Sequence, residues 1–254
     1  VDEYDFFFLL PKNSTATSLI RQAGFEVHEM QMKELRKDIL SFLRYLPILF
    51  YNANLLARLL KKLKIDLINV NDFYNLLPAC YKFFGGKTPY VCYVRFLPSR
   101  FPKPLVSLWC GLHGRFASFV IAVSEAVIKE LPTRNNVVVI GNELPAENIS
   151  FTPSASKHIL YPANYIQGKG QEYALESFAT IHKQHPEWKL KFVGGDMGLQ
   201  KNKEFKAGLI KQANRLQLEK QVEWHDFSVK ISDDYLSASF VLNFSASESF
   251  SMTC

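Results

Sequence analysis

The sequence has few cysteines, and none of the spacings that cysteine chemistry requires. Its 254 residues include only four of them, at Cys80, Cys92, Cys110 and Cys254. No C-x-x-C pair and no metal-ligand spacing occurs among them. A redox motif, a structural zinc site and a disulfide framework are therefore not indicated, and we expect reduced thiols in a cytosolic protein.

Long hydrophobic runs are also absent. No apolar run approaches the roughly 18–20 residues that a membrane-spanning helix needs. The start of the chain lacks a basic segment followed by an apolar one, which is the pattern of a secretion signal. The sequence thus predicts neither a membrane span nor a secretion signal, and we expect a cytoplasmic location.

The excess of positive charge is mild. The formal net charge is +6 and the isoelectric point is about 9.0. This balance suits an anionic ligand or an acidic membrane surface, but it is too small to indicate a nucleic-acid-binding protein. Apolar residues are abundant at 48%, with 21 Phe and 11 Tyr, which is enough for one or two ordinary hydrophobic cores.

Short apolar strands alternate with helical patterns along the chain. Strands are expected at residues 6–10, 25–30, 66–70, 89–94, 119–123, 137–140, 159–161, 189–193, 222–224 and 240–243. The helical stretches between them predict parallel pairing through right-handed crossovers, which is the doubly wound α/β class. One helical pattern, at 33–64, is expected to break near Pro47. The apolar pattern lapses at 143–157, so we predict a linker there between domains of residues 1–145 and 146–254.

One candidate site element follows the strand at residue 160. Segment 160–170 reads LYPANYIQGKG, which predicts a strand, a short loop and a helix that Lys169 and Gly170 open. A helix start offers free N–H groups and a positive dipole end, and the lysine ammonium adds a point charge. This combination suits phosphate groups. The alternative is a loop that needs glycine for its positive φ angles, beside a solvated lysine.

Two further strand ends carry candidate residues. Segment 188–196, WKLKFVGGD, predicts a strand and a turn in which Gly194 allows a close backbone approach, at the edge where open α/β sheets bind ligands. An ordinary tight turn is the alternative. Segment 222–227, VEWHDF, predicts a strand whose exit loop carries Asp226 and Phe227. His225 fits a structural hydrogen-bonding role better than a catalytic one.

The end of the chain supplies a candidate carboxylate. Segment 235–251, YLSASFVLNFSASESFS, predicts a helix, a strand and a turn that leads into Glu248, Ser249, Phe250 and Ser251. A carboxylate accepts paired hydrogen bonds from neighbouring hydroxyl groups, and these bonds are stronger than neutral ones. A solvated loop acid is the alternative.

Together these segments resemble the nucleotide-sugar-binding half of the retaining glycosyltransferases of family 4, or glycosyl transferases group 1. The resemblance implies the GT-B fold, in which two Rossmann-like domains with doubly wound parallel sheets face a cleft. It also implies that a sugar moves with retention from a nucleoside-diphosphate sugar to an acceptor hydroxyl. The product would belong to a polysaccharide, a glycolipid or a cell-surface glycan, and the acceptor is a glycan or a lipid-linked molecule.

The resemblance assigns roles to individual residues. Lys169 would stabilise the diphosphate leaving group, and Glu248 would orient the sugar through its hydroxyls. Donor binding would involve Asn164, Lys169, Gly170, Gly194, Asp226, Phe227, Glu248, Ser249, Phe250 and Ser251. We expect no metal and no cofactor, because the lysine and the helix dipoles take the place of a metal and the sequence has no Asp-x-Asp motif.

The sequence departs from the family pattern at several positions. Asn164 stands where the family usually has Arg, and Ser249 and Ser251 stand where it has glycines. The family's second glutamate would fall two residues beyond Cys254, and nothing before Phe6 matches its first strand, loop and helix. We therefore expect a fragment of a longer protein. A non-catalytic donor-binding or scaffold subunit is the second hypothesis.

The first half of the chain resembles the family's other domain more weakly. Segment 66–72, DLINVND, is similar to a D-x-x-H-x-H strand with Asn69 and Asn71 at the histidine positions. Segment 119–125, FVIAVSE, is similar to the strand that precedes a helix, which Ser124 is predicted to cap.

Basic residues gather between positions 33 and 64. They are Lys33, Arg36, Lys37, Arg44, Arg58, Lys61, Lys62 and Lys64. Interleaved leucines and aromatic residues make the segment amphipathic, so a peripheral contact with the inner membrane face is one interpretation. The pattern favours the other interpretation, a solvated helix face over a packed core.

Overall fold

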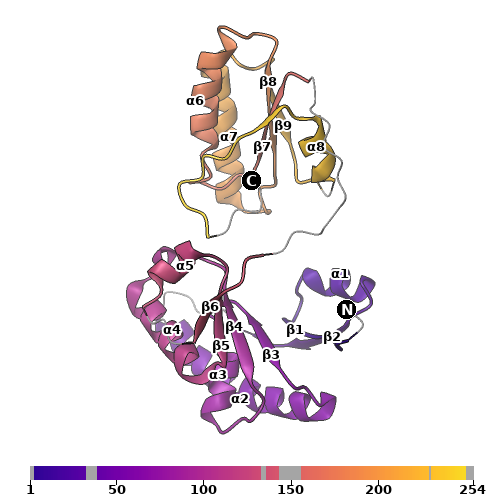
Figure 1. The fold of residues 1–254 in the computed structure, drawn as a ribbon, viewed down its shortest axis with the longest axis vertical. Helices are drawn as coiled ribbons and strands as arrows, with labels where there is room; N and C mark the ends of the chain where they lie inside the picture. The colour runs from indigo at the N-terminus through magenta and orange to yellow at the C-terminus, as the bar shows by residue number, and fades with distance from the viewer. Residues whose placement is uncertain (1–2, 33–38, 133–135, 143–155, 229, 250–254) are drawn as a thin grey trace. The chain divides into compact units, whose positions relative to one another are not determined.

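The computed structural model describes residues 3–32, 39–132, 136–142, 156–228 and 230–249. The chain divides into two compact units, Val1–Gly141 and Asn142–Cys254, and each unit contains a parallel sheet (Figure 1). Most of the predicted linker, residues 143–155, lies outside the described residues.

The first unit begins with a strand, a helix and a strand: β1 (Phe7–Pro11), α1 (Ala16–Gln22) and β2 (Glu26–Met30). Its four-stranded sheet has the order β3 (Ile68–Asn71), β4 (Tyr90–Val94), β5 (Phe119–Ala122) and β6 (Val137–Val139). The connecting elements are α2 (Ile39–Leu63), α3 (Leu77–Phe83), η1 (Pro98–Arg100), α4 (Lys103–Phe116) and α5 (Glu125–Glu130). All strand pairs are parallel, as the alternation of strands and helices predicted.

Helix α2 runs through Pro47, so the predicted break at this residue was wrong. A proline inside a helix costs about 3 kcal/mol relative to alanine, because it removes an N–H donor and crowds the preceding turn. The helix is held by its apolar face, where Leu49, Ala53, Leu56 and Leu60 are buried at helical spacing. This burial offsets the local cost, since tertiary packing supplies most of the stability of helices in proteins.

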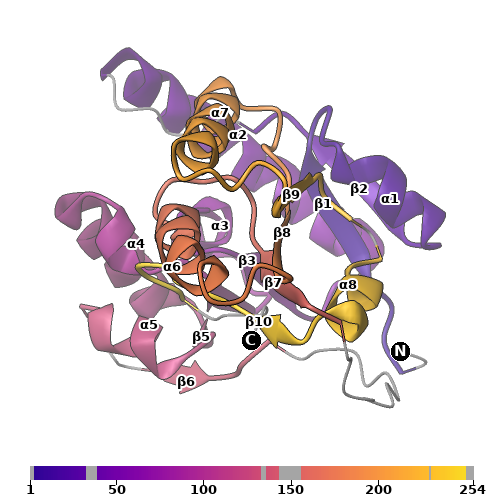
Figure 2. The ribbon, with the colours of Figure 1, turned by 90° about the horizontal axis from the view of Figure 1, so that it is seen from above.

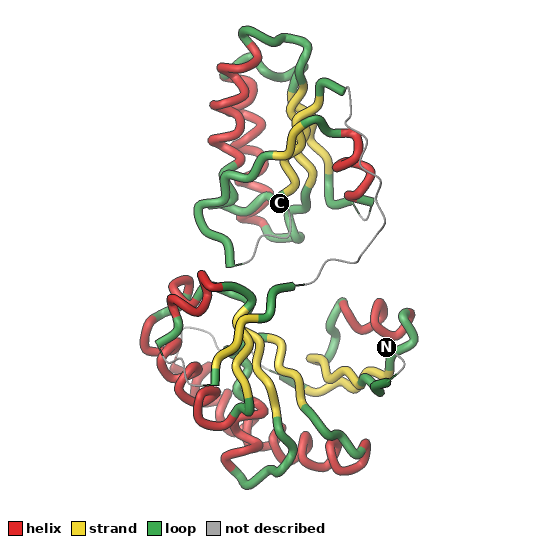
Figure 3. The backbone as a smooth tube through the Cα atoms, viewed as in Figure 1, coloured by secondary structure: helices red, strands yellow, loops and turns green. Residues whose placement is uncertain are grey.

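The second unit is a four-stranded parallel sheet of order β10-β7-β8-β9 with helices on both faces. Its elements are β7 (His158–Pro162), α6 (Gln171–His182), β8 (Lys189–Val193), α7 (Gln200–Arg215), β9 (Val222–His225), α8 (Ile231–Ser237) and β10 (Phe240–Val241). Figures 1 and 2 show α6 and α7 on one side of this sheet and α8 on the other. Figure 3 shows the strands as the middle layer.

Alternating side chains along the strands build the two cores of this unit. Tyr161 and Phe192 point to the larger core, which α6 and α7 complete with Leu175, Phe178 and Leu209. Their strand neighbours Leu160 and Val193 point the opposite way, toward Ala238 and the partly buried Ile231 and Tyr235 around α8. The two-residue period of each strand therefore fixes which side chains serve which face.

Two element ends differ from the sequence prediction for local reasons. β10 stops at Val241 instead of residue 243, because Asn243 Oδ1 accepts a hydrogen bond from Ser245 N at 3.0 Å and starts a turn. The helical pattern at residues 74–84 predicts a helix that begins at Tyr74, but α3 begins at Leu77, after Asn75 Oδ1 accepts a bond from Leu77 N at 3.2 Å. The predicted cap of α5 is confirmed, since Ser124 Oγ accepts a bond from Val127 N at 3.3 Å. In the part of the chain that the structure describes, no helix combines the length and the apolar content that crossing a membrane requires.

Candidate functional site

The sequence-predicted site residues of the second unit gather at one edge of its sheet. Because all four strands are parallel, their carboxyl ends lie at the same edge, and four loops leave from it. Asn164, Lys169 and Gly170 follow β7, and Gly194 follows β8. Asp226 and Phe227 follow β9, and Glu248 and Ser249 follow β10. The predicted residues Phe250 and Ser251 lie outside the described residues.

The structure brings Lys169 and Glu248 into direct contact. The Lys169 Nζ lies 2.6 Å from Glu248 Oε1, although the two residues are 79 positions apart in the chain. About a quarter of each side chain is exposed, at 25% for Lys169 and 27% for Glu248. A cation and an anion are therefore held side by side, both within reach of a ligand in solvent, and each can serve a different part of that ligand.

A buried tyrosine joins the two loops that carry this pair, and sequence reasoning missed it. Tyr161 is 1% exposed, and its hydroxyl donates a hydrogen bond to the Lys169 carbonyl at 2.6 Å. The same hydroxyl accepts a bond from Phe244 N at 2.8 Å. Ala246 N also donates to the Gly168 carbonyl at 3.0 Å. A polar ring at a buried strand position was the only hint of this role in the sequence.

The side-chain oxygen of Asn164 is already bound to another loop of the protein. Its Oδ1 accepts a hydrogen bond from Gly195 N at 2.9 Å, which ties the loop after β7 to the turn after β8. Its main-chain carbonyl accepts a bond from Nε2 of the fully buried Gln171, also at 2.9 Å. Within the described residues no hydrogen bond engages the Asn164 Nδ2, so this group can donate to a ligand.

Two glycines of the site are required by the close approach of other backbone. A Cβ built on Gly194 would lie 2.1 Å from the Ala163 carbonyl oxygen, and one on Gly170 would lie 2.3 Å from the Phe244 carbonyl oxygen. Gly170 also has a φ of +79°, a conformation that side chains disfavour. The sequence suggested that Gly194 makes room for a ligand. The structure gives both glycines a packing role between neighbouring loops.

The loop after β9 is exposed at this edge. Phe227 is 70% exposed, and Asp226 forms an ion pair with Lys206 of α7, whose Nζ lies 2.9 Å from the Asp226 Oδ1. The hydrogen bond from Lys206 lowers the pKa of Asp226. The His225 carbonyl accepts a bond from the Tyr165 hydroxyl at 3.1 Å, while its exposed imidazole lies 3.6 Å from Glu223. These contacts position the loop, and they leave the Phe227 ring open to a flat ligand group.

In the first unit, Asp72 stands out at the carboxyl end of β3, directly after Asn71. Its φ is 106°, which is unusual for a residue other than glycine, and it is only 3% exposed. Its Oδ1 accepts bonds from Phe73 N at 3.2 Å and Arg95 N at 3.4 Å. Burial raises the pKa of Asp72 from 3.8 to about 6, against the lowering effect of these bonds. Sequence reasoning noted this acid only as the end of a strand motif.

The raised pKa predicts how Asp72→Asn changes stability with pH. Asp72 has a higher pKa in the folded state, about 6, than its ordinary value of 3.8. Its contribution to the stability of the fold is therefore complete below pH 3.8 and is lost as the pH rises through about 6. Asparagine keeps the Oδ1 acceptor and tolerates a positive φ, so the variant should gain about 3 kcal/mol at pH 7.5. Chemical denaturation at pH 7.5 and pH 4 measures the difference, which should disappear at the lower pH. The exposed Asp66→Asn is the matched control, and an equal gain in both variants would contradict the explanation.

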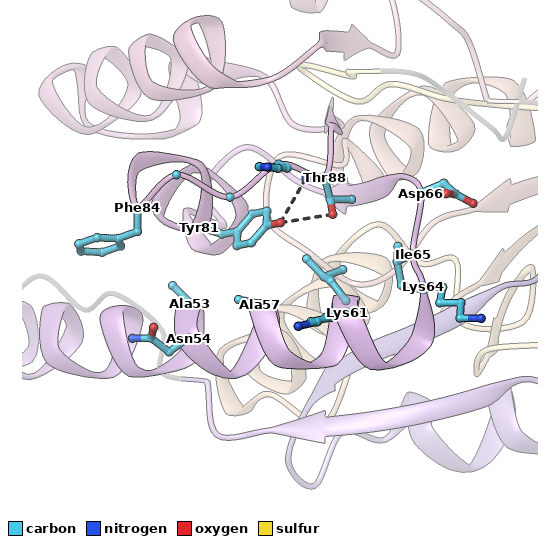
Figure 4. A pocket seen from close by; sticks show the side chains of 14 residues that line it. Ala53, Asn54, Ala57, Lys61, Lys64, Ile65, Asp66, Tyr81, Phe84 and Thr88 are labelled. Carbon is cyan, nitrogen blue, oxygen red and sulfur yellow. Dashed lines mark hydrogen bonds between the residues drawn. The ribbon is translucent and has the colours of Figure 1, made fainter.

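A cavity of about 600 Å³ lies at the amino ends of β3 and β4 in the first unit (Figure 4). Asp72 lies at the other edge of their sheet, where the strands have their carboxyl ends. The apolar lining of the cavity comes from α2 and the end of α3, and its charged lining comes from Lys61, Lys64, Lys87 and Asp66. The Tyr81 hydroxyl donates to Thr88 Oγ1 at 3.3 Å and accepts from Thr88 N at 3.2 Å, which holds one wall in place. No predicted site residue lines this cavity.

The described ranges contain no group of three or more His, Cys, Asp or Glu side chains that could hold a metal ion. His113 is buried in α4, where its ring nitrogens meet the Tyr90 hydroxyl at 3.1 Å and the Phe73 carbonyl at 2.8 Å. Burial lowers the pKa of His113 to about 4, so this histidine is a neutral structural group at physiological pH.

Two family models match the chain. The one described as "Glycosyl transferases group 1" matches residues 127–254, which is 128 of the 254 residues. The one described as "Glycosyltransferase Family 4" matches residues 19–143. A search of curated proteins found no match.

Solved structures with the same fold include HepE of Anabaena in complex with UDP and glucose. This chain is 20% identical to it with a TM-score of 0.75, and the match covers 94% of this chain and 67% of that one. A glycosyltransferase from Rickettsia africae is 15% identical with a TM-score of 0.68, covering 95% and 73%. The apo form of the lipopolysaccharide outer core galactosyltransferase WaaB is 14% identical with a TM-score of 0.65, covering 97% and 76%. This chain thus spans about two thirds of the length of HepE, and at these identities the likeness shows the GT-B fold alone.

Proposed function

Because the chain belongs to the glycosyl transferases group 1 family, we propose that it transfers a sugar from a nucleoside-diphosphate sugar to an acceptor hydroxyl with retention. The observation that carries the proposal is the contact between Lys169 and Glu248 at the carboxyl edge of the second sheet. A nucleotide sugar has an anionic diphosphate and a sugar rich in hydroxyls, joined at one carbon. A cation and an anion 2.6 Å apart match these two neighbouring parts.

Each residue of the pair has one task in this proposal. The Lys169 ammonium binds the diphosphate and neutralises the charge that grows on it as the bond to the anomeric carbon breaks. The Glu248 carboxylate accepts hydrogen bonds from the sugar hydroxyls and fixes the orientation of the ring. The acceptor oxygen attacks the face that the diphosphate leaves, and its proton passes to the departing diphosphate. The Asn164 Nδ2, which no hydrogen bond engages within the described residues, and the exposed Phe227 ring make further contacts with the nucleotide sugar in this proposal.

The test of this proposal is donor binding by the 254-residue chain. HepE structures contain UDP with glucose and UDP-glucose, so UDP-glucose is the first probe. Thermal unfolding is measured with UDP-, GDP- and ADP-glucose, each at about 100 times an expected dissociation constant. Binding to the folded state alone then stabilises by about 2.7 kcal/mol, which raises the melting temperature by several degrees. We expect one nucleobase to give this rise. No rise with any donor would refute donor binding by this chain.

A non-catalytic scaffold is the second candidate, and the Asn164 contact favours it. Asparagine is neutral, so Asn164 supplies no charge to the nucleotide sugar. Its side-chain oxygen is bound to Gly195 N, so only the Nδ2 group of the amide is left to bind a ligand. A scaffold would bind the donor without turnover. A transfer assay separates the two, because a bound donor that is hydrolysed or transferred no faster than in buffer indicates a scaffold.

We further propose that the first unit contacts anionic membrane lipid through the surface beside its cavity. The exposed rings of Phe83 and Phe84 lie 5.4 Å apart at the end of α3, and Phe50 lies 5.5 Å from Phe84. Lys61 and Lys64 stand on the same wall of the cavity as the apolar residues of α2. The exposed Phe84 ring and these lysines line one cavity, at different ends of it, and such a surface suits the interface of an anionic bilayer. The more N-terminal basic residues of the predicted face, at 33–44, fall where the structure describes no side chains.

Co-sedimentation with liposomes tests this contact. The bound fraction should rise as phosphatidylserine replaces phosphatidylcholine, and replacing Lys61, Lys64 and Lys87 by glutamine should cost about 1 kcal/mol per lysine in binding. The matched control replaces the exposed Lys201, Lys203 and Lys220 of the second unit, which removes the same charge. Binding that stays flat as anionic lipid rises would refute the membrane contact.

A further inference from the structure

The hydroxyl of Tyr161 is placed to control the geometry of the Lys169–Glu248 pair. Tyr161 lies on β7, the strand between β10 and β8, so it sits beneath the loops that follow both β7 and β10. Its hydroxyl donates to the carbonyl of Lys169 itself, at 2.6 Å. It also accepts from Phe244 N, at 2.8 Å, four residues before Glu248. One oxygen atom therefore joins the two chain segments that carry the pair.

This bridge uses both the donor and an acceptor position of a buried hydroxyl. The tyrosine is 1% exposed, so water does not compete for its donor or its acceptor position. Hydrogen bonds in such surroundings are stronger than at the surface, and their geometry is correspondingly fixed. The Tyr161 ring is itself held in the core, with its centroid 5.4 Å from that of Phe192 and 6.2 Å from that of Phe244.

Two further contacts hold the loop after β7 against the loop after β10. Ala246 N donates to the Gly168 carbonyl at 3.0 Å, which pairs the two loops beyond the tyrosine. The backbone of Phe244 approaches Gly170 so closely that a Cβ on the glycine would lie 2.3 Å from the Phe244 carbonyl oxygen. The loops thus meet along their length. Without the hydroxyl, the carbonyl of Lys169 and the amide of Phe244 would lose their shared partner.

We propose that Tyr161 is a positioning residue whose hydroxyl sets the separation of Lys169 and Glu248, and through it the affinity for the nucleotide-sugar donor. This inference rests on the proposed function, because it assigns a consequence to donor binding. Tyr161 touches no donor in this scheme. It acts on the donor through the backbone of Lys169 and through the segment that leads to Glu248.

The test is Tyr161→Phe, which keeps the ring and removes the bridge. In this variant the amide hydrogen of Phe244 should exchange with solvent faster than in the wild type. UDP-glucose should bind about five- to tenfold more weakly, as expected for the loss of one buried hydrogen bond. Binding is measured by calorimetry well below the melting temperature. The control is Tyr90→Phe, which removes an equally buried hydroxyl from the first unit, where it contacts His113. It should change neither readout.

A double-mutant cycle separates positioning from general stability. If Tyr161 acts through the pair, its removal should cost less than twofold on a Lys169→Met background, because the residue that it positions is already gone. An undiminished loss on that background, or an unchanged affinity in Tyr161→Phe, would overturn the inference while the proposed function stands. A wild-type chain that binds no nucleotide sugar would refute the proposed function. Even then, equal exchange of the Phe244 amide in both chains would refute the bridge.

Discussion

Replacement of Lys169 by methionine is expected to weaken the binding of UDP-glucose by about ten- to hundredfold. The reason is the loss of a charge-assisted hydrogen bond to a phosphate oxygen, which contributes about 1.5–3 kcal/mol. Methionine keeps the length of the aliphatic stem, so the packing of the loop changes little. The loss leaves Glu248 without its partner at 2.6 Å, and its negative charge then also repels the diphosphate. Calorimetric titration of both chains with UDP-glucose measures the difference.

Lys189→Met is the matched control for this prediction. Lys189 also pairs with a glutamate, at 2.8 Å from Glu223, but it lies at the amino end of β8, on the other edge of the sheet. The control removes the same charge and an ion pair of the same kind, and it should leave donor affinity within about twofold, since exposed ion pairs contribute little. Equal weakening in the two variants would mean that net charge, and not the position of Lys169, governs binding.

Glu248→Gln should separate the two halves of the donor. The neutral amide releases Lys169 from its ion pair, so UDP without a sugar should bind as tightly as to the wild type or more tightly. The advantage of UDP-glucose over UDP should shrink, because the carboxylate no longer accepts bonds from the sugar hydroxyls. An unchanged preference for UDP-glucose would contradict the role proposed for Glu248.

The second large effect is expected at Gly194, where an added methyl group has no space. A Cβ at this position would lie 2.1 Å from the Ala163 carbonyl oxygen and 2.8 Å from Asn164 N, and backbone atoms cannot move aside as a side chain can. The backbone here is also fixed by hydrogen bonds from Gly194 N to the His225 carbonyl and from Ala163 N to the Val193 carbonyl. Gly194→Ala should therefore destabilise the second unit by about 3 kcal/mol, and denaturant titration measures the loss.

Gly208→Ala is the control for this prediction, and its expected change in stability has the opposite sign. Gly208 lies inside α7, and nothing stands within 4 Å of a Cβ built on it. Alanine in the interior of a helix is favoured over glycine by about 0.5–1 kcal/mol, so this variant should be more stable than the wild type. A stability loss at Gly194 no larger than the change at Gly208 would show that the turn relaxes, and that the close approach to Ala163 is not required.

The sequence predicted those features that depend on residues close together in the chain. The alternation of strands and helices gave the parallel α/β class, and Ser124 capped its helix as its neighbours indicated. Pro47 shows the limit of such local rules, because the buried face of α2 outweighed the cost of the proline. The proposed roles of Lys169 and Glu248 depended on a family resemblance, and their convergence on one site was a prediction from it.

By itself, the sequence determined the order of the elements and the edge of the second sheet at which the candidate residues lie. The reason is that the periodicity of apolar residues and the alternation of strands with helices can be recognised in short segments. Only the tertiary structure decided which loops touch. It placed Lys169 against Glu248, gave the Tyr161 hydroxyl its two partners, and pressed Gly194 against Ala163. The physical reason is distance along the chain: Tyr161 and Phe244 are 83 residues apart, and no local pattern encodes which backbone groups meet once the sheet has formed.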